Sequence, residues 1–318
     1  MLFGEYHFRG VLEDDAVLPP FKGSTFRGVF GRALKEVTCA LRHQECPACL
    51  LRNQCVYTRV FEYPPDLLPR GAPTPPHPFV IEPPLTPRTH FFRGETFEFT
   101  LLLFGFANQC LPYFVYAFEQ MGRIGIGRRL EGRRARFRLL SVSTSEGESI
   151  YHFRDRALEG DRTAPLTWEA LAAGRPVEKL TLELLTPLRL KFQNRLQAEL
   201  PFHVLLRAAL RRLSTLSQYF GQGEPPLDYK GLIARAQEVA VAESSLSWTD
   251  WQRYSHRQDR AMLLGGLTGR VTYVGALTEF VPFLRFVEKV HLGKATTFGL
   301  GKIALSNPSH KGLDHEGR

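Results

Sequence analysis

The hydrophobic and polar positions of the first half of the chain predict two helices set among strands. Apolar and polar residues alternate over 2–13, which predicts a strand, and further strands are expected over 91–104 and 136–142. A helix is expected from Ser24, a suitable N-cap, because apolar residues follow it at helical spacing. A second helix is expected over 111–121. The apolar face of the first helix consists of Phe26, Val29, Phe30, Ala33, Leu34, Val37 and Leu41.

The second half repeats this order of elements. It predicts a strand over 178–190, a helix over 201–220 and a strand over 267–274. A helix follows over 277–287, and its proline is tolerated only near the first turn. A short strand is expected over 303–305.

The repeated order fits a βαββαβ ferredoxin-like, RRM-like unit used twice in tandem, so the predicted fold class is α+β. The expected domains are 1–145 and 177–305, with a polar connector over 146–176 and a flexible tail over 306–318. A proline-rich excursion over 64–90 contains a further short strand.

Composition and charge indicate a folded protein and the kind of partner that it binds. The 318 residues are 43% hydrophobic, which suffices for about two packed domains and excludes a disordered chain. Lys and Arg number 41 against 32 Asp and Glu, a net charge of +9, which favours a polyanionic partner. The N-terminus lacks an apolar signal-peptide core, and Asn108, Gln109 and Pro112 interrupt the most apolar stretch. We therefore expect a cytoplasmic protein that does not enter a membrane.

Four cysteines lie close together after the first predicted helix. Cys46 and Cys49 form a CxxC turn, and Cys39 and Cys55 lie within seven residues of it. Four thiolates at this spacing can converge on one tetrahedral ion, so we expect a small structural zinc knuckle over 39–55, inserted after the first helix. An iron–sulfur cluster uses the same ligands, and four reduced cysteines without metal are the remaining alternative. A complete four-thiolate site is closed, so it would stabilise the fold and take no part in catalysis.

Two basic, glycine-rich loops are candidate phosphate-binding segments. The first covers 122–129 and leads into a track with six arginines and one acid between positions 128 and 138. The second covers 291–302, where Lys294 and Lys302 flank the glycines. Glycine lets the backbone approach a phosphate closely. A solvated charged hairpin is the alternative for either loop alone, but loops in both halves together favour nucleic acid. A Rossmann fold is excluded because the preceding strand and the downstream acid are missing.

His43 lies inside the cysteine cluster, directly after the first predicted helix. Imidazole titrates near neutral pH, so His43 can serve as a general acid or base. It can also replace one cysteine as a zinc ligand, or it can be an ordinary surface histidine. The chain has no HExxH, GxSxG or P-loop pattern.

The second glycine-rich loop resembles that of a known superfamily. Its pattern, Gly293-Lys294-x-x-x-Phe298-Gly299-x-Gly301, is similar to the terminal glycine-rich loop of the RAMP superfamily of CRISPR proteins. Other segments resemble the branch of processing endoribonucleases: Gly265-Gly266, Arg253-Tyr254-Ser255, Thr186-Pro187-Leu188-Arg189, and the run from Cys46 to Tyr57 that ends in Phe61-Glu62. The resemblance spans nearly the whole chain and is weakest over 64–90 and 144–176.

The resemblance implies a metal-independent ribonuclease that cuts the repeats of a CRISPR transcript into guide RNAs. The ribose 2′-OH attacks the adjacent phosphate and leaves a 2′,3′-cyclic phosphate and a 5′-OH, with no catalytic cofactor. A non-catalytic crRNA-binding subunit of a CRISPR effector complex is the main alternative. A zinc-containing regulator of duplex DNA is a third, but the chain has no recognition-helix motif with suitable cysteine and histidine spacing.

The resemblance also suggests roles for individual residues. His43 occupies the place where the family often has its general base or acid, Lys35 is the candidate for charge stabilisation, and Tyr57 is the candidate for positioning. Gly31 departs from the pattern, because the first helix lacks the tyrosine that some members use. The expected partners are CRISPR repeat RNA or crRNA and effector-complex subunits; the oligomeric state is not predicted. The expected RNA-binding residues are Arg123, Gly125, Gly127, Arg128, Arg129, Arg133, Arg134, Arg207, Arg211, Arg257, Gly293, Lys294, Gly299, Gly301 and Lys302.

Overall fold

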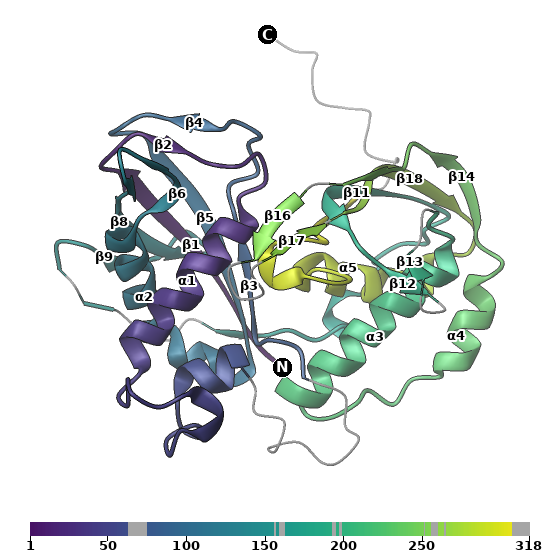
Figure 1. Ribbon diagram of the computed structural model, residues 1–318. Coiled ribbons are helices and arrows are strands. Elements are labelled where there is room, and N and C mark those ends of the chain that lie inside the picture. Colours follow the sequence, from purple (N-terminus) through teal and green to yellow (C-terminus); the bar gives the residue numbers. More distant parts are fainter. Residues whose placement is uncertain are drawn as a thin grey trace, which may run out of the picture. The chain divides into compact units, whose positions relative to one another are not determined.

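The structure is a computed structural model of the 318-residue chain (Figure 1). It describes all residues except 63–74, 156, 159–162, 193–194, 197–198, 251, 256–259, 264 and 307–318. Arg257 and nearly all of the predicted tail therefore lie outside the described residues. Among the residues that are described, no helix has the length and hydrophobicity of a membrane span.

The chain divides into two units. Unit 1 contains Met1–Pro165 together with Leu216–Gly223 and Thr297–Gly299. Unit 2 contains Leu166–Thr215, Glu224–Thr296 and the described residues from Leu300 on. A short piece of the second glycine-rich loop thus belongs to unit 1.

Unit 1 contains an antiparallel sheet in the order β3-β5-β1-β8-β9, with β10 against β1. Its elements are β1 (Leu2–Leu12), β2 (Ala16–Val17), α1 (Gly23–Thr38), β3 (Phe79–Glu82), β4 (His90–Phe91), β5 (Thr96–Phe104), α2 (Leu111–Ile124), β6 (Ile126–Leu130), β7 (Arg133–Ala135), β8 (Phe137–Thr144), β9 (Ser149–His152) and β10 (Ala164–Pro165). The strands flanking α1 and α2 are β1, β3, β5 and β8. Their order is therefore 2-3-1-4, as in a ferredoxin-like βαββαβ unit.

Helices α1 and α2 lie side by side in unit 1 (Figure 1) and share a core of phenylalanines with the sheet. The ring of Phe118 in α2 lies 4.7 Å from that of Phe30 in α1 and 4.8 Å from that of Phe8 in β1, measured between centroids. Phe99 of β5 stacks on Phe8 at 4.9 Å. Burying one such side chain stabilises the fold by about 1.5–3 kcal/mol. The predicted apolar faces of both helices therefore pack into the same hydrophobic core.

Unit 2 repeats the arrangement with the sheet order β14-β18-β11-β19 and with β15 paired to β18. Its elements are β11 (Lys179–Leu188), β12 (Lys191–Phe192), β13 (Arg195–Leu196), α3 (Phe202–Phe220), α4 (Tyr229–Ala236), β14 (Ala240–Ser244), β15 (Ser247–Thr249), β16 (Gln252–Ser255), β17 (Arg260–Leu263), β18 (Gly266–Val274), α5 (Val281–Val290) and β19 (Ile303–Ser306). The last five residues of α3, 216–220, are counted with unit 1. The main strands again follow the order 2-3-1-4, and all their pairs are antiparallel.

Aromatic contacts hold the helices of unit 2 onto its sheet. Phe202 at the start of α3 packs edge-on against Tyr273 of β18 and against Phe280, at 5.0 and 5.2 Å between ring centroids. The buried hydroxyl of Tyr273 donates a hydrogen bond to the Leu200 carbonyl at 2.7 Å. Pro282 lies in the first turn of α5, as its tolerance in a helix requires.

Two local predictions are wrong. Helix α1 begins at Gly23 with Lys22 in the N-cap position. The buried Ser24 hydroxyl has no hydrogen-bond partner among the described residues, so Ser24 does not cap the helix. The strand expected over 91–104 is divided into β4 and β5. A turn at Gly94, with φ of +86°, separates them, and only a residue without a side chain adopts that conformation readily.

Candidate nucleic-acid interface

Unit 2 contains a cationic cavity of about 770 Å³ beside α3, which we call the α3 groove. Its described lining residues include six cationic side chains and no acidic one. They are Arg189, Leu190, Lys191, Val204, Arg207, Ala208, Arg211, Arg212, Thr215, Gly293 and Lys294. A concave surface of this charge suits a phosphate backbone.

Three segments far apart in the sequence supply these cations. Arg207 and Arg211 are four residues apart on α3, which places them on one face of the helix. Arg189 and Lys191 follow the end of β11. The backbone N–H of Lys294 donates to the Arg189 carbonyl at 2.9 Å, and this bond holds the second glycine-rich loop at the end of β11.

The positive charges of the groove repel one another. Burial lowers the pKa of Lys294, and the nearby charges of Lys191, Arg189 and Arg211 lower it further. A phosphate bound among these side chains would relieve that repulsion, because an anion favours the charged form of each cation. The positive potential of the groove therefore favours the binding of a polyanion.

Arg212 has a structural function in the groove. Its guanidinium donates to the carbonyls of Val290 and His291, at 2.8 and 3.2 Å, where α5 ends. A cation there complements the negative end of the helix dipole and satisfies carbonyls that have no partner within the helix. Burial lowers its pKa to about 10, so it stays charged at neutral pH.

Of the predicted RNA-binding residues, the structure brings Arg207, Arg211, Gly293 and Lys294 together in the α3 groove. The sequence interpretation missed Arg189 and Lys191, although two basic residues directly after a strand are a signal that could have pointed to them. Lys302 is not among the described lining residues of the groove. Its carbonyl accepts hydrogen bonds from the backbone N–H groups of Leu185 and Thr186 in β11, and its own N–H donates to the Thr186 hydroxyl.

The glycine at position 301 has a role within the fold. Its φ is +73°, and a β-carbon there would lie 1.8 Å from the Leu292 carbonyl oxygen. Gly127, in the first glycine-rich loop, likewise passes close to the Val17 carbonyl oxygen, at 2.5 Å from an added β-carbon. At these two positions the close approach that requires glycine is to the protein's own backbone.

Unit 1 presents a second basic surface, the hairpin formed by β6 and β7. Arg128 and Arg129 are exposed on β6, Arg134 on β7 is half-buried, and Arg123 is exposed in the last turn of α2. These four side chains remain candidates for phosphate contacts.

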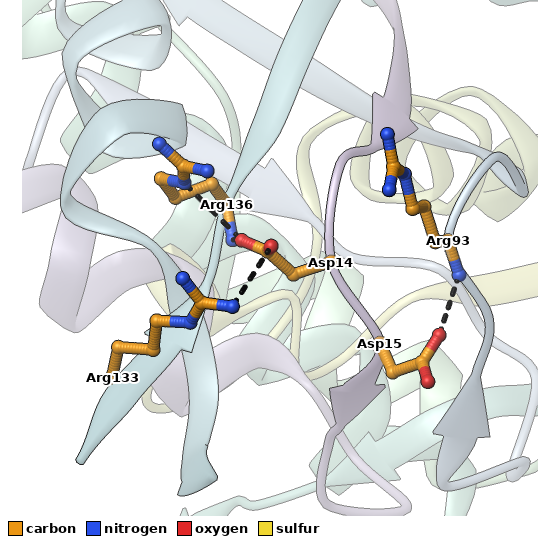
Figure 2. A network of polar contacts seen from close by, with 5 residues as sticks. All are labelled: Asp14, Asp15, Arg93, Arg133 and Arg136. Carbon is orange, nitrogen blue, oxygen red and sulfur yellow. Dashed lines mark hydrogen bonds and ion pairs between the residues drawn. The ribbon is translucent and has the colours of Figure 1, made fainter. Parts of the chain in front are cut away.

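Asp14 engages Arg133 and Arg136 at the base of this hairpin (Figure 2). One carboxylate oxygen accepts from the backbone and the side chain of Arg136, at 3.1 and 3.2 Å, and the other lies 3.9 Å from Arg133. The Arg136 backbone N–H is the largest cause that lowers the pKa of Asp14. Arg133 is thus partly neutralised, unlike its neighbours on β6.

The three predicted catalytic residues lie near the end of α1, but only two of them come into contact. The Lys35 ammonium lies 5.8 Å from the centre of the Tyr57 ring. The Tyr57 hydroxyl donates to Glu62 at 3.1 Å. His43 is exposed and makes no hydrogen bond or ion pair within the described part of the chain.

Two residues of unit 1 that the sequence interpretation missed lie in a more organised setting. The Arg27 guanidinium lies between the rings of Phe61 and Phe298, at 4.4 and 4.6 Å from their centres, and donates to the Thr297 hydroxyl at 2.9 Å. His77 donates from Nδ1 to the Val60 carbonyl at 3.2 Å. Its signal in the sequence, a histidine directly before the strand at 79–82, is weak by itself.

The charge state of His77 follows from these neighbours. Burial and the positive charge of Arg27 lower its pKa to about 4, so its imidazole is neutral at physiological pH. A neutral imidazole next to a guanidinium is a pair that can accept a proton and stabilise an anion.

The expected zinc knuckle is not supported. All four cysteines are described, yet no group of three or more His, Cys, Asp or Glu side chains in the described residues is arranged to hold a metal ion. The segment after α1 forms short helical turns, and its four cysteines form no disulfide with one another. The Cys46 thiol lies beside Lys35 and Glu62. Burial raises the pKa of that thiol, and the nearby Lys35 charge opposes the shift. Among the described residues, the four cysteines therefore do not form the metal site that their spacing predicts.

The fold and the groove define a class of protein with two tandem ferredoxin-like units and a concave cationic surface. Residues 182–303 match the family described as CRISPR-associated endoribonuclease Cas6, and residues 1–163 match a family described as an N-terminal domain, AF_1859_N. The chain therefore belongs to the family of this N-terminal domain, and its second half contains a segment that matches the Cas6 endoribonuclease family.

One curated protein and two solved structures are similar to nearly the whole chain. An uncharacterized protein of Archaeoglobus fulgidus is 27% identical over 317 residues, which cover 95% of this chain and 93% of that protein. A Thermus thermophilus Cas6 structure matches with a TM-score of 0.55 and 16% identity, over 96% of this chain and 98% of that one. A chain of a Cas6-RT-Cas1–Cas2 complex matches with a TM-score of 0.60 and 15% identity, over 98% of this chain and 47% of that one. The two structures share the fold with this chain.

Proposed function

We propose that this protein is a metal-independent endoribonuclease that cuts CRISPR repeat RNA within the precursor transcript. The observation that carries the proposal is the α3 groove, with six cationic side chains and no acid among its described lining residues, in a chain whose residues 182–303 match the Cas6 family. The crRNA product then passes to subunits of a CRISPR effector complex.

The proposed reaction is an in-line attack of a ribose 2′-OH on the adjacent phosphate. The O2′–P bond forms, the bond to the 5′ oxygen breaks, and the products are a 2′,3′-cyclic phosphate and a 5′-OH. A base takes the 2′-OH proton, an acid protonates the leaving oxygen, and a cation stabilises the charge on phosphorus. His43 is proposed as base or acid, Lys35 as the stabilising cation and Tyr57 as a positioning group. Lys35 and Tyr57 are already neighbours in the structure.

The neutral imidazole of His77 next to Arg27 is a competing candidate for the base. Phosphate bound to Arg27 would offset its positive charge and so raise the pKa of His77, which strengthens the base when substrate is present.

The first test is cleavage of labelled repeat RNA in EDTA, beside the same RNA with a 2′-deoxy sugar at the cut. We expect cutting in EDTA that the deoxy sugar abolishes. His43→Ala should lower the single-turnover rate by about 100-fold or more, with RNA binding unchanged. His90→Ala is the matched control, since His90 is an exposed histidine of unit 1 outside the proposed machinery.

The possible outcomes separate the candidates. Loss of cutting in His77→Ala but not in His43→Ala would transfer the role of base to His77. Full activity in both variants would contradict both assignments.

A guide-holding, non-catalytic protein is the second candidate. One observation favours it: among the described residues, His43 forms no hydrogen bond or ion pair with Lys35 or Tyr57. Tight binding of repeat RNA without any cutting would establish this alternative.

A further inference from the structure

A second cavity, of about 450 Å³, lies between α3 and α4 in unit 2, and we call it the α3–α4 pocket. Its lining residues are Arg207, Leu210, Arg211, Ser214, Glu224, Tyr229, Lys230, Ile233, Ala234 and Gln237. Those of α3 recur at intervals of three and four residues, as do those of α4, so one face of each helix forms a wall. The α3–α4 pocket shares Arg207 and Arg211 with the α3 groove.

The walls of the pocket differ in chemistry. Leu210 of α3 is buried and Ile233 of α4 is half-buried, so the wall formed by each helix contains an apolar side chain. Ser214 donates to Glu224 at 2.8 Å, and the Tyr229 hydroxyl donates to the Pro225 carbonyl at 3.0 Å. Burial raises the pKa of Tyr229, so its hydroxyl stays protonated.

This combination suits a planar group with N–H donors at one edge. An apolar wall packs against the face of a ring, and a carboxylate accepts hydrogen bonds from ring and amino N–H groups. Arg207 and Arg211 line both the pocket and the groove, so an RNA backbone that binds these two side chains lies next to the pocket. Sequence-specific recognition of RNA usually takes unstacked bases in this way.

We propose that the α3–α4 pocket binds one unstacked guanine of the RNA whose phosphates lie in the α3 groove. Guanine carries an imino and an amino N–H on the same edge, so it offers two donors to Glu224. Adenine and cytosine offer only an amino group, and uracil only an imino N–H. The proposal rests on the proposed function, because the base reaches the pocket as part of the RNA held in the groove.

The test uses the full chain and a pool of single-stranded RNA with randomised positions, and it sequences the bound fraction without any cutting step. The wild-type protein should enrich guanine at one position. Glu224→Gln should remove that enrichment, because the amide presents N–H groups where the base needs an acceptor. Ile233→Trp should also remove it, since the larger ring fills the pocket.

Glu238→Gln is the matched control, as Glu238 is exposed, follows α4 and does not line the pocket. It makes the same change of charge and should retain the preference. Circular dichroism melting establishes whether each variant is folded. If Ile233→Trp is unfolded, the result for Glu224→Gln alone decides the test.

A second measurement uses the selected RNA with inosine in place of the enriched guanine, which removes only the 2-amino group. Inosine should weaken binding to the wild-type protein by about tenfold, the scale of a hydrogen bond to a charged group, and should have no effect on Glu224→Gln. The salt dependence of binding should be the same in both proteins, because the phosphate contacts are unchanged.

Two results would overturn the inference and leave the proposed function intact. One is RNA binding by the wild-type protein without any guanine preference, and the other is a preference that survives both pocket substitutions. Failure of the wild-type protein to bind single-stranded RNA above duplex DNA would instead contradict the proposed function, and the pocket assignment with it.

Discussion

His77 shows how one side chain acquires its properties from its surroundings. Its ring packs against Phe61 and Phe79, at 6.0 and 5.9 Å between centroids, with Arg27 close enough to oppose protonation. Burial disfavours the charged imidazole and the neighbouring cation adds to this effect, so the pKa falls to about 4. The nearby Glu62 opposes the shift without reversing it.

This pKa has a consequence for stability. Between about pH 6.5 and about pH 4 the unfolded chain binds a proton at His77 and the folded chain does not, so the free energy of unfolding falls as the pH is lowered. The full shift corresponds to roughly 3 kcal/mol at most. We expect His77→Gln to reduce this loss, measured by urea unfolding at pH 4 and pH 7.

The control for this experiment is His90→Gln, because His90 is an exposed histidine in the same unit. Its pH dependence should equal that of the wild-type protein. An equal loss of stability in the wild-type protein and in His77→Gln would contradict the assigned burial of His77.

At the scale of single elements, the β6–β7 hairpin depends on one carboxylate. Asp14 accepts hydrogen bonds from the backbone and the side chain of Arg136, where the hairpin leads into β8 (Figure 2). Asp15, the next residue, instead accepts from the backbone N–H of Arg93 at 2.8 Å. The two adjacent acids therefore bind two different segments: Asp14 binds Arg136 directly before β8, and Asp15 binds Arg93 in the turn before β5.

We expect Asp14→Ala to destabilise the hairpin by about 1 kcal/mol, because the lost hydrogen bonds are largely exposed to water. Amide exchange at Arg136 should become faster, as measured by NMR. Asp15→Ala is the matched control and should accelerate exchange at Arg93 only. Unchanged exchange at Arg136 in Asp14→Ala would mean that the strand pairing alone holds the hairpin.

At the scale of the whole molecule, an excess of nine positive charges is spread unevenly. Many surface cations have acidic partners, such as Lys179, 3.9 Å from Glu243, and Arg235, 2.7 Å from Glu279. Among the described residues, the lining of the α3 groove contains six cations and no acid. We therefore expect the net charge to attract RNA most strongly at the α3 groove.

This distribution predicts the salt dependence of RNA binding. Lys294→Gln should lower the slope of log K against log salt concentration by about one, because one phosphate contact releases about one counterion. Lys179→Gln is the matched control and should leave the slope unchanged, as its charge is already paired. Filter binding of the same RNA across a salt series measures both, and equal slopes would mean that Lys294 does not contact phosphate.

The sequence by itself determined the elements whose signals are local. The alternation over 2–13 and the apolar stripe that includes Phe26 and Phe30 correspond to β1 and α1, and the repeated order in the second half corresponds to a second sheet of the same strand order. Such patterns suffice because burial of one face demands a fixed period in a strand or a helix. The terminal glycine-rich loop likewise pointed to the family.

Only the tertiary structure decided which side chains act together. Arg189, Arg207 and Lys294 meet in the α3 groove although more than a hundred residues separate the first from the last. The spacing of the four cysteines predicted a metal site, but close spacing in sequence does not fix the directions of side chains in irregular turns. The pKa of His77 also depends on residues of other segments, and the α3–α4 pocket depends on how two successive helices pack. Periodicity carries no information about these contacts, because they depend on how whole elements pack.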